Sequence, residues 1–288
     1  MLSFINLLRP KHWIKNTFVF LPIFFAGEIF SNTKFYDCLA GLIIFSLSAS
    51  SIYALNDIFD VEEDRSHPEK KKRPIASGKI SIKSAVFIAI TLFIISIGSA
   101  YYLDFTFFIC IVIYLVLNLG YSFGLKNIAI LDLFIVAFGF LLRVIAGGEI
   151  SEVPVSHWLM IMVLLLSLFL VLAKRRDDLI LVEKGNKSIR KASSGYNIDF
   201  TNACLTLLSS VMIVSYIMYT VSEEVQARYN SQYLFLTCVF VIAGLMRYLQ
   251  ITMVEKKSGS PIKILYKDVF IFVVLLAWVL SFYILLYV

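Results

Sequence analysis

Residues 37–64 read DCLAGLIIFSLSASSIYALNDIFDVEED, a long apolar run that passes without a break into an acidic stretch. Residues 37–57 alone supply the roughly 20 mostly apolar residues that a helix needs to cross a bilayer. The run is about twice as long as the alternating segments of about 10 residues that form membrane barrel strands. The segment therefore predicts a transmembrane helix with carboxylates at one end.

The composition of the whole chain has the same character. Of its 288 residues, 59% are hydrophobic and 16% are charged, against about 45–50% and about 25% in soluble domains. A soluble protein of this size could not bury so much apolar surface in one core, and a disordered chain shows the opposite balance. We therefore expect an all-α polytopic membrane protein, with residues 1–288 forming a single integral membrane domain.

The apolar runs predict nine transmembrane helices. Their approximate limits are 17–34, 37–57, 82–103, 105–122, 128–147, 157–173, 200–221, 232–253 and 268–287. Asp104 marks a tight turn between the third and fourth helices. Pro22 lies within the first, where a membrane helix tolerates it with a kink.

The distribution of basic residues predicts the orientation. Nearly all of the 26 Lys and Arg residues fall in the N-terminal segment and in alternate loops, and only Lys34 and Arg228 fall in loops on the other side. The positive-inside rule places the basic side in the cytoplasm. We expect a multi-pass protein of the inner (plasma) membrane with a cytoplasmic N-terminus and an external C-terminus. The net charge of +6 then reflects topology and does not indicate a nucleic-acid partner.

The acidic stretch carries the clearest chemical signal. Asn56, Asp60 and Asp64 are four residues apart, and Asp57 precedes Asp60 by three, so on a helix they share one face. Carboxylates on one face repel each other unless a cation lies between them, and Mg²⁺ is usually held by one or two carboxylates together with substrate phosphates. The alternative is a solvated acidic helix end, which accounts well for the neighbouring Glu62 and Glu63.

A second polar cluster, Lys174-Arg175-Arg176-Asp177-Asp178, opens the loop after the sixth span. Its Lys and Arg residues could surround the oxygens of a diphosphate, although an ordinary basic cytoplasmic flank is the alternative. Arg143 lies deep in the fifth span. It pairs either with Glu149 or another outer acid, or it lines a cavity if Gly147-Gly148 breaks the helix. Asp132 is a candidate partner for Lys126.

At these residues the sequence resembles the UbiA-type intramembrane prenyltransferases, whose motif NDxxDxxxD is matched by Asn56, Asp57, Asp60 and Asp64. The likeness is closer to one branch, the decaprenyl-phosphate phosphoribosyltransferases. It is carried by Arg9–Asn16 (RPKHWIKN), Asp64–Pro68 (DRSHP), Arg73–Gly78 (RPIASG), Tyr121–Lys126 (YSFGLK), Leu142–Gly148 (LRVIAGG), Ala173–Arg175 (AKR) and Ile189–Lys191 (IRK). One departure is that Arg176 stands where the branch usually has Tyr, and Asp178 where it has Glu.

The resemblance implies a nine-helix UbiA-like bundle around a cavity that opens to the cytoplasm. It implies transfer of phosphoribose from 5-phosphoribosyl 1-diphosphate to a polyprenyl phosphate, with Mg²⁺ as cofactor. The implied metal ligands are Asp57, Asp60 and Asp64, and the implied catalytic residues are Asp57, Asp60, Lys174 and Arg175. The implied substrate-binding residues are Lys15, Asn16, Asn56, Lys71, Arg73, Tyr121, Lys126, Asp178 and Arg190.

Two other functions compete with this one. A UbiA-type enzyme could instead move a polyprenyl group from its diphosphate to an aromatic acceptor. A transporter or lipid-binding protein without chemistry is the third possibility, but transporter sites favour broken helices near the bilayer midplane. The sequence does not decide whether the protein forms an oligomer.

Overall fold

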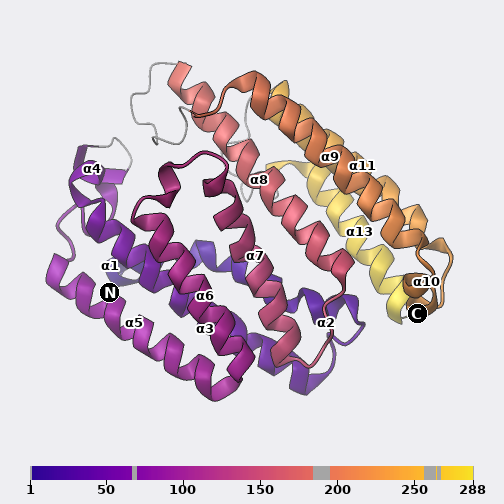
Figure 1. Ribbon diagram of the computed structural model, residues 1–288, viewed down its shortest axis with the longest axis horizontal. Helices are drawn as coiled ribbons and strands as arrows, with labels where there is room; N and C mark the ends of the chain where they lie inside the picture. Colours follow the sequence, from indigo (N-terminus) through magenta and orange to yellow (C-terminus); the bar gives the residue numbers. More distant parts are fainter. Residues whose placement is uncertain (1, 67–69, 184–194, 256–263, 265–266, 288) are drawn as a thin grey trace. The chain divides into compact units, whose positions relative to one another are not determined.

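The computed structural model describes residues 2–66, 70–183, 195–255, 264 and 267–287, and these residues fold into helices and connecting turns (Figure 1). The elements are α1 (Leu2–Leu8), η1 (Pro10–Phe20), α2 (Leu21–Phe25), α3 (Asn32–Phe59), α4 (Val61–Ser66), η2 (Lys70–Lys72), α5 (Ile82–Leu103), α6 (Phe105–Ser122), η3 (Leu125–Asn127), α7 (Leu131–Ile150), α8 (His157–Glu183), α9 (Ile198–Val221), α10 (Glu223–Tyr229), η5 (Tyr233–Thr237), α11 (Cys238–Met253) and α13 (Val269–Tyr287). Elements named η are 3₁₀ helices.

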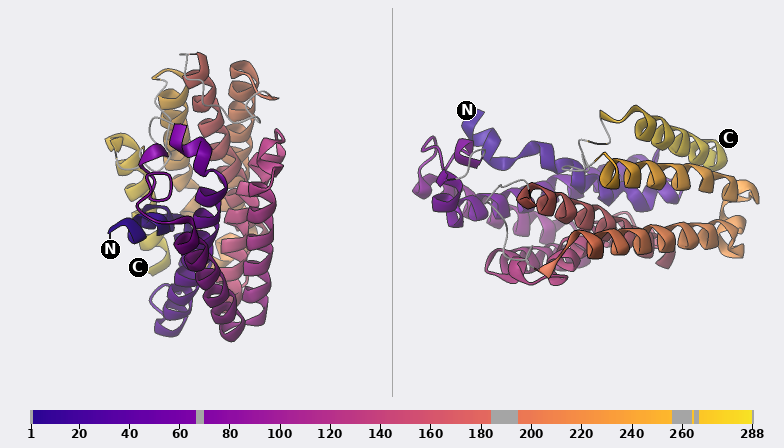
Figure 2. Two further views of the ribbon diagram at one scale, coloured as in Figure 1. Left: turned by 90° about the vertical axis from the view of Figure 1, so that its left-hand side faces the viewer. Right: turned by 90° about the horizontal axis from the view of Figure 1, so that it is seen from above.

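The chain divides into two compact units, which are described separately. Unit 1 comprises Met1–Leu125 and Phe138–Val155, and unit 2 comprises Lys126–Ala137 and Ser156–Val288. In unit 1, α3 packs against α1, η1, α5 and α6. In unit 2, α8, α9, α11 and α13 pack in succession (Figures 1 and 2). Each unit buries its own apolar cluster.

Seven helical segments of the described residues are long and apolar enough to cross a membrane. They are Asn32–Phe59, Ile82–Leu103, Phe105–Ser122, Leu131–Ile150, His157–Ile180, Ile198–Val221 and Tyr233–Met253. These segments match seven of the predicted spans, so the chain is a multi-pass membrane protein. Helix α13 covers the ninth predicted span, but its described apolar part, Val269–Leu285, is shorter than the others.

The predicted first span, 17–34, is wrong, and the expected count of nine is not confirmed. Helix α2 ends at Phe25, Gly27 takes a positive φ of 75°, and α3 begins at Asn32. The helical part starts earlier than predicted, at Pro10, as the 3₁₀ helix η1. Three residues per turn place every third side chain on one face, so Trp13, Asn16 and Val19 can all face α3. Trp13 donates to Ser50 Oγ at 3.1 Å, and Asn16 and Val19 are buried.

Two other predicted boundaries are also corrected. Helix α7 runs through Gly147 and Gly148 to Ile150, so the glycines do not break it. A Cβ added at Gly147 would lie 2.0 Å from the Val19 carbonyl oxygen, so a glycine is needed there for close packing of α7 on η1. Helix α8 extends through Lys174 and Asp178 to Glu183, so the second polar cluster is helical and does not open a loop.

Candidate active site

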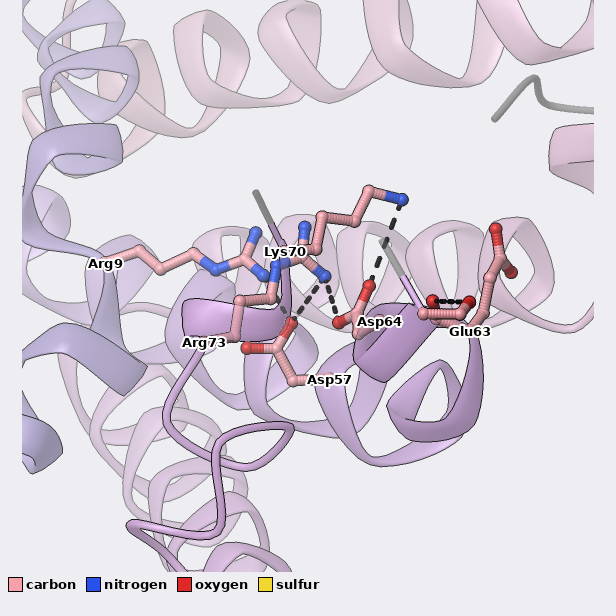
Figure 3. A network of polar contacts seen from close by, with 7 residues as sticks. Arg9, Asp57, Glu63, Asp64, Lys70 and Arg73 are labelled. Atoms are coloured by element: carbon pink, nitrogen blue, oxygen red, sulfur yellow. Dashed lines mark hydrogen bonds and ion pairs between the residues drawn. The ribbon is translucent and has the colours of Figure 1, made fainter. Parts of the chain in front are cut away.

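Asp57 and Asp64 form the centre of a charge cluster in unit 1 (Figure 3). Both carboxylate side chains are about 1% exposed. Arg73 Nη1 donates to Asp57 Oδ1 at 3.1 Å and to Asp64 Oδ2 at 2.6 Å. Arg9 donates to the same Asp57 oxygen, and Lys70 Nζ lies 3.9 Å from Asp64 Oδ1. The two acids thus lie together, but the Arg73 guanidinium lies between them.

Arg73 is positioned by the turn that follows it. Ser77 N donates to Arg73 O at 2.9 Å, and Gly78 takes a φ of 73° that suits glycine. Ile75 and Ile80 are buried in an apolar cluster that also contains Leu7 and Ala85. These apolar anchors hold the turn while the Arg73 side chain reaches back to the acids.

Arg9 is positioned by an uncommon backbone conformation. It lies between α1 and η1 with φ 52° and ψ 57°, the left-handed region that disfavours L-residues. Ser50 Oγ donates to Leu8 O at 2.9 Å, and His12 N donates to Arg9 O at 2.8 Å, so both sides of Arg9 are fixed. Its guanidinium carbon lies 5.0 Å from the centre of the Tyr53 ring.

The two acids suit a cation, although no metal-binding set is assembled. Asp57 Oδ2 and Asp64 Oδ1 are buried and accept no hydrogen bond. Among the residues that the structure describes, no three His, Cys, Asp or Glu side chains gather to hold a metal ion. Asp60 is partly exposed at the break between α3 and α4. The space between the two acids is occupied by Arg73.

The remaining predicted substrate-binding residues of unit 1 lie in several elements. Lys15 on η1, Asn56 on α3 and Tyr121 on α6 are partly exposed, whereas Lys71 on η2 is exposed. Asn16 is 1% exposed, and both the nitrogen and the oxygen of its side-chain amide are hydrogen-bonded. It donates to Ser46 Oγ at 2.8 Å and accepts from Arg143 Nε at 2.8 Å. These bonds connect η1 to α3 and α7 through Asn16.

Arg143 follows neither of the two expectations. It is 5% exposed and has no carboxylate partner among the described residues. Its guanidinium donates to Asn16, to Gly139 O and, at 3.3 Å, to the Tyr114 hydroxyl. Its central carbon lies 4.7–5.7 Å from the ring centres of Phe45, Tyr114 and Phe140. Neutral groups therefore hold this charge within unit 1.

Unit 2 contains a second charge cluster around Arg175. Arg175 Nε donates to Asp132 Oδ2 at 2.6 Å, and Nη1 donates to Asp178 Oδ2 at 3.2 Å. Tyr196 donates its hydroxyl to Asp132 Oδ1 at 2.7 Å and accepts from Ile130 N. Burial and the hydrogen bond to Asp132 raise the pKa of Tyr196, so its phenol stays protonated. Asp132 thus has two partners that the sequence did not indicate.

The other predicted basic residues of unit 2 do not contact Asp132 in the bonds described above. Arg176 is 3% exposed and donates to Asn202 Oδ1 at 2.6 Å and to Thr252 O, so it ties α8 to α9 and α11. Lys174 is exposed, and Lys126 on η3 is partly exposed. Arg190 lies outside the described residues.

Comparison with known proteins identifies the family. The UbiA prenyltransferase family matches residues 17–181. The chain belongs to this family. A decaprenyl-phosphate phosphoribosyltransferase of Mycolicibacterium smegmatis is 34% identical over 96% of this chain and 89% of its own length. The enzyme of the same name from Corynebacterium glutamicum is 31% identical over 96% and 84%. This UbiA-family chain is therefore an enzyme.

Solved structures show the same fold. A UbiA homolog from Archaeoglobus fulgidus bound to GPP and Mg²⁺ has a TM-score of 0.72 with 19% identity, covering 99% of this chain and all of that one. A UbiA homolog from Aeropyrum pernix has a TM-score of 0.66 with 14% identity, covering 94% and 98%. At these identities the likeness concerns the fold alone.

Sequence reasoning missed two members of the charge cluster in this UbiA-family chain, Arg9 and Lys70. Arg9 was noted only as part of a resembling segment, yet it contacts Asp57 from 48 positions away. The Arg9-Pro10 step did not signal it, because a proline favours an extended backbone in the residue before it, whereas Arg9 takes the left-handed region. A contact of that separation does not follow from spacing along one helix.

Proposed function

We propose that the enzyme transfers 5-phosphoribose from 5-phosphoribosyl 1-diphosphate to a polyprenyl phosphate, in a Mg²⁺-dependent reaction that releases pyrophosphate. The observation that carries this proposal is the match to decaprenyl-phosphate phosphoribosyltransferases over 96% of the chain. Two buried carboxylates beside several cations support it, because this chemistry needs a metal and groups for several phosphates.

The reaction breaks the bond between the anomeric carbon and the diphosphate oxygen, and pyrophosphate leaves with the electron pair. A new bond joins that carbon to an oxygen of the lipid phosphate. The transition state has oxocarbenium character, as in glycoside chemistry. The attacking phosphate is already an anion, so no general base is required. The carboxylates therefore serve to bind and not to remove a proton.

Asp57 and Asp64, with Asp60 between them in sequence, are the proposed metal ligands. Asp57 Oδ2 and Asp64 Oδ1, which accept no hydrogen bond from the described residues, support this role. Magnesium bound there supplies Lewis-acid stabilisation of the leaving diphosphate. The carboxylates lie at the end of α3 that is predicted to be cytoplasmic. At this position the polar sugar diphosphate does not have to enter the hydrocarbon core of the bilayer.

The cations are the proposed phosphate ligands. Arg73 already lies between the two acids, and its fork suits phosphate oxygens. Lys174 and Arg175 are proposed to stabilise the leaving group, and Arg175 is held by Asp132 and Asp178. Further proposed substrate contacts are Lys15, Asn16, Asn56, Lys71, Tyr121, Lys126, Asp178 and Arg190. The active site is proposed to face the cytoplasm of the inner membrane.

One observation favours a second function. A solved structure with the same fold holds the prenyl diphosphate GPP together with Mg²⁺. The alternative is therefore transfer of a polyprenyl group from its diphosphate to an aromatic acceptor.

A donor assay separates the two functions. Purified enzyme with Mg²⁺ receives labelled 5-phosphoribosyl 1-diphosphate and several polyprenyl phosphates, and in parallel a prenyl diphosphate with an aromatic acid. We expect label to enter the lipid only in the first reaction. We expect Asp57→Asn to lower this rate at least about 100-fold, since the metal loses a ligand. Glu62→Gln is the matched control, because Glu62 is 81% exposed and its ion-pair partner Arg65 is exposed as well. Turnover in the second reaction alone would overturn the proposal.

A further inference from the structure

We propose that Arg9 is the counter-ion of Asp57 in the metal-free enzyme. When metal and diphosphate bind, the Arg9 guanidinium leaves the Asp57 carboxylate. The binding of the metal and the binding of the diphosphate therefore depend on each other. The inference rests on the proposed metal site at Asp57. It assigns to Arg9 a role that the motif around the acids does not contain.

The first step concerns the cost of the buried acid. The Asp57 side chain is 1% exposed, and a buried carboxylate is unfavourable unless it is paired. Arg9 and Arg73 both donate to its Oδ1 atom, and together they stabilise the charge. With Lys70 beside Asp64, three basic side chains face two buried acids (Figure 3). Basic side chains therefore offset the charges of both acids without a metal.

The second step concerns competition. A divalent cation on Asp57 would lie within a few ångströms of both guanidinium groups, and like charges at that distance repel strongly. Arg73 also donates to Asp64 Oδ2 at 2.6 Å and can keep this bond, because the other oxygen, Asp64 Oδ1, accepts no hydrogen bond from the described residues and is left for the metal. Among the described residues, Asp57 is the one carboxylate paired with Arg9. Arg9 is therefore the group that a metal displaces.

The third step concerns how far Arg9 can move. Its backbone is held in the left-handed region between Leu8 and His12, whose contacts fix both sides. A non-glycine residue in that region is uncommon and signals a local constraint. The side chain, 21% exposed and lying along the Tyr53 ring, is the part that can swing. Rotation about the side-chain bonds would release the guanidinium from the carboxylate for a phosphate oxygen, which suits the same fork.

The consequence is a thermodynamic coupling. Without diphosphate, Arg9 occupies Asp57 and weakens metal binding. Diphosphate gives Arg9 another anion, so it strengthens metal binding, and metal must strengthen diphosphate binding by the same factor. An enzyme with this device loads its metal together with its donor.

The test measures metal binding directly, without turnover. The probe is Mn²⁺, which takes the same oxygen ligands as Mg²⁺ and is counted by its EPR signal on purified full-length protein in detergent. We expect Mn²⁺ alone to bind Arg9→Gln at least about tenfold more tightly than wild type, because one repelling charge is removed. Arg65→Gln is the matched control, since Arg65 pairs with exposed Glu62 and should leave Mn²⁺ affinity unchanged. Arg9→Lys keeps the charge and should resemble wild type.

The coupling is measured by repeating the Mn²⁺ titration with pyrophosphate, which both candidate donors release. The free Mn²⁺ concentration is corrected for the Mn²⁺–pyrophosphate complex that forms in solution without protein. We expect pyrophosphate to tighten Mn²⁺ binding to wild type several-fold more than to Arg9→Gln. If Arg9→Gln does not fold, the absence of any pyrophosphate effect on wild type overturns the inference. If Arg9→Gln binds Mn²⁺ as wild type does, or more weakly, and Asp57→Asn does not bind it, the inference about Arg9 is overturned and the proposed metal site is retained. If Asp57→Asn also changes nothing, the proposed metal site itself falls.

Discussion

Arg143 in unit 1 and Arg175 in unit 2 are both buried arginines, 5% and 2% exposed, but their charges are held in different ways. Arg175 is paired with two carboxylates, Asp132 and Asp178. Arg143 has none among the described residues and relies on an amide, a carbonyl, a hydroxyl and three aromatic faces. A buried ion pair ties two charges together, so each is costly without the other. A charge held by neutral groups leaves no opposite charge behind when it is removed.

Removing Arg175 is the strongest way to test this difference. Arg175→Met leaves the carboxylate of Asp132, itself fully buried, with a single hydrogen bond from Tyr196. We expect a loss of about 3–5 kcal/mol of stability, because an uncompensated buried charge remains. The measurement is thermal unfolding of the purified protein in detergent. The double variant Arg175→Met/Asp132→Asn removes both charges and should recover part of the loss. No recovery would mean that packing, not charge, is what Arg175 supplies.

The neutral arrangement around Arg143 depends on η1 lying against α7, and Gly147 controls that contact. Gly147→Ala would place a Cβ 2.0 Å from the Val19 carbonyl oxygen, so the backbone of η1 must shift and carry Asn16 with it. We expect a loss of about 3 kcal/mol, at the upper end for overpacking. Gly98→Ala on α5 is the matched control, because nothing lies within 4 Å of its added Cβ. Equal unfolding temperatures for the two variants would contradict the close packing of η1.

Arg143→Met tests the neutral cage itself. The change leaves Asn16 Oδ1 and Gly139 O without this donor, but it leaves no unpaired charge. We expect a loss of about 2 kcal/mol, typical of an unsatisfied buried acceptor and smaller than that of Arg175→Met. The same unfolding assay gives the ranking. A loss as large as that of Arg175→Met would show that Arg143 has an anionic partner, and would end the contrast between the two arginines.

The parts of the fold that depend on local pattern could be predicted from the sequence. Helices α5 and α6 have the predicted limits, 82–103 and 105–122, because an apolar run sets each length and Asp104 caps α6 by accepting from Phe107 N at 2.6 Å. Helix η1 could not be predicted, because a 3₁₀ helix of 11 residues is uncommon and is held here by contacts with α3. Helix α8 extends beyond its apolar run because Arg175 and Arg176 find the buried partners Asp132 and Thr252 within unit 2.

The candidate site also has a part that could be predicted from local spacing and a part that could not. The one-face spacing predicted that Asp57 and Asp64 meet, and they share Arg73. The roles of Arg9, Asn16 and Arg143 depend on contacts between segments 48 and 127 residues apart. Spacing along one helix contains no information about such contacts, so the sequence left Arg143 between two expectations that were both wrong.

Tyr196→Phe has the smallest expected effect on stability, and it tests the ion pair between Arg175 and Asp132, because Tyr196 donates to Asp132. The variant removes the hydroxyl that donates to Asp132 and accepts from Ile130 N, and we expect a loss of about 1 kcal/mol near neutral pH. The pKa of Tyr196 is raised in the fold, so this stability is fully present below the ordinary tyrosine pKa of about 10 and is lost as the pH rises above it. The gap in unfolding temperature between wild type and Tyr196→Phe should therefore narrow above about pH 10. Tyr102→Phe, at a side chain that is 93% exposed, should show no gap at any pH. A gap for Tyr196→Phe that stays constant with pH would show that the hydroxyl contributes packing and not its proton.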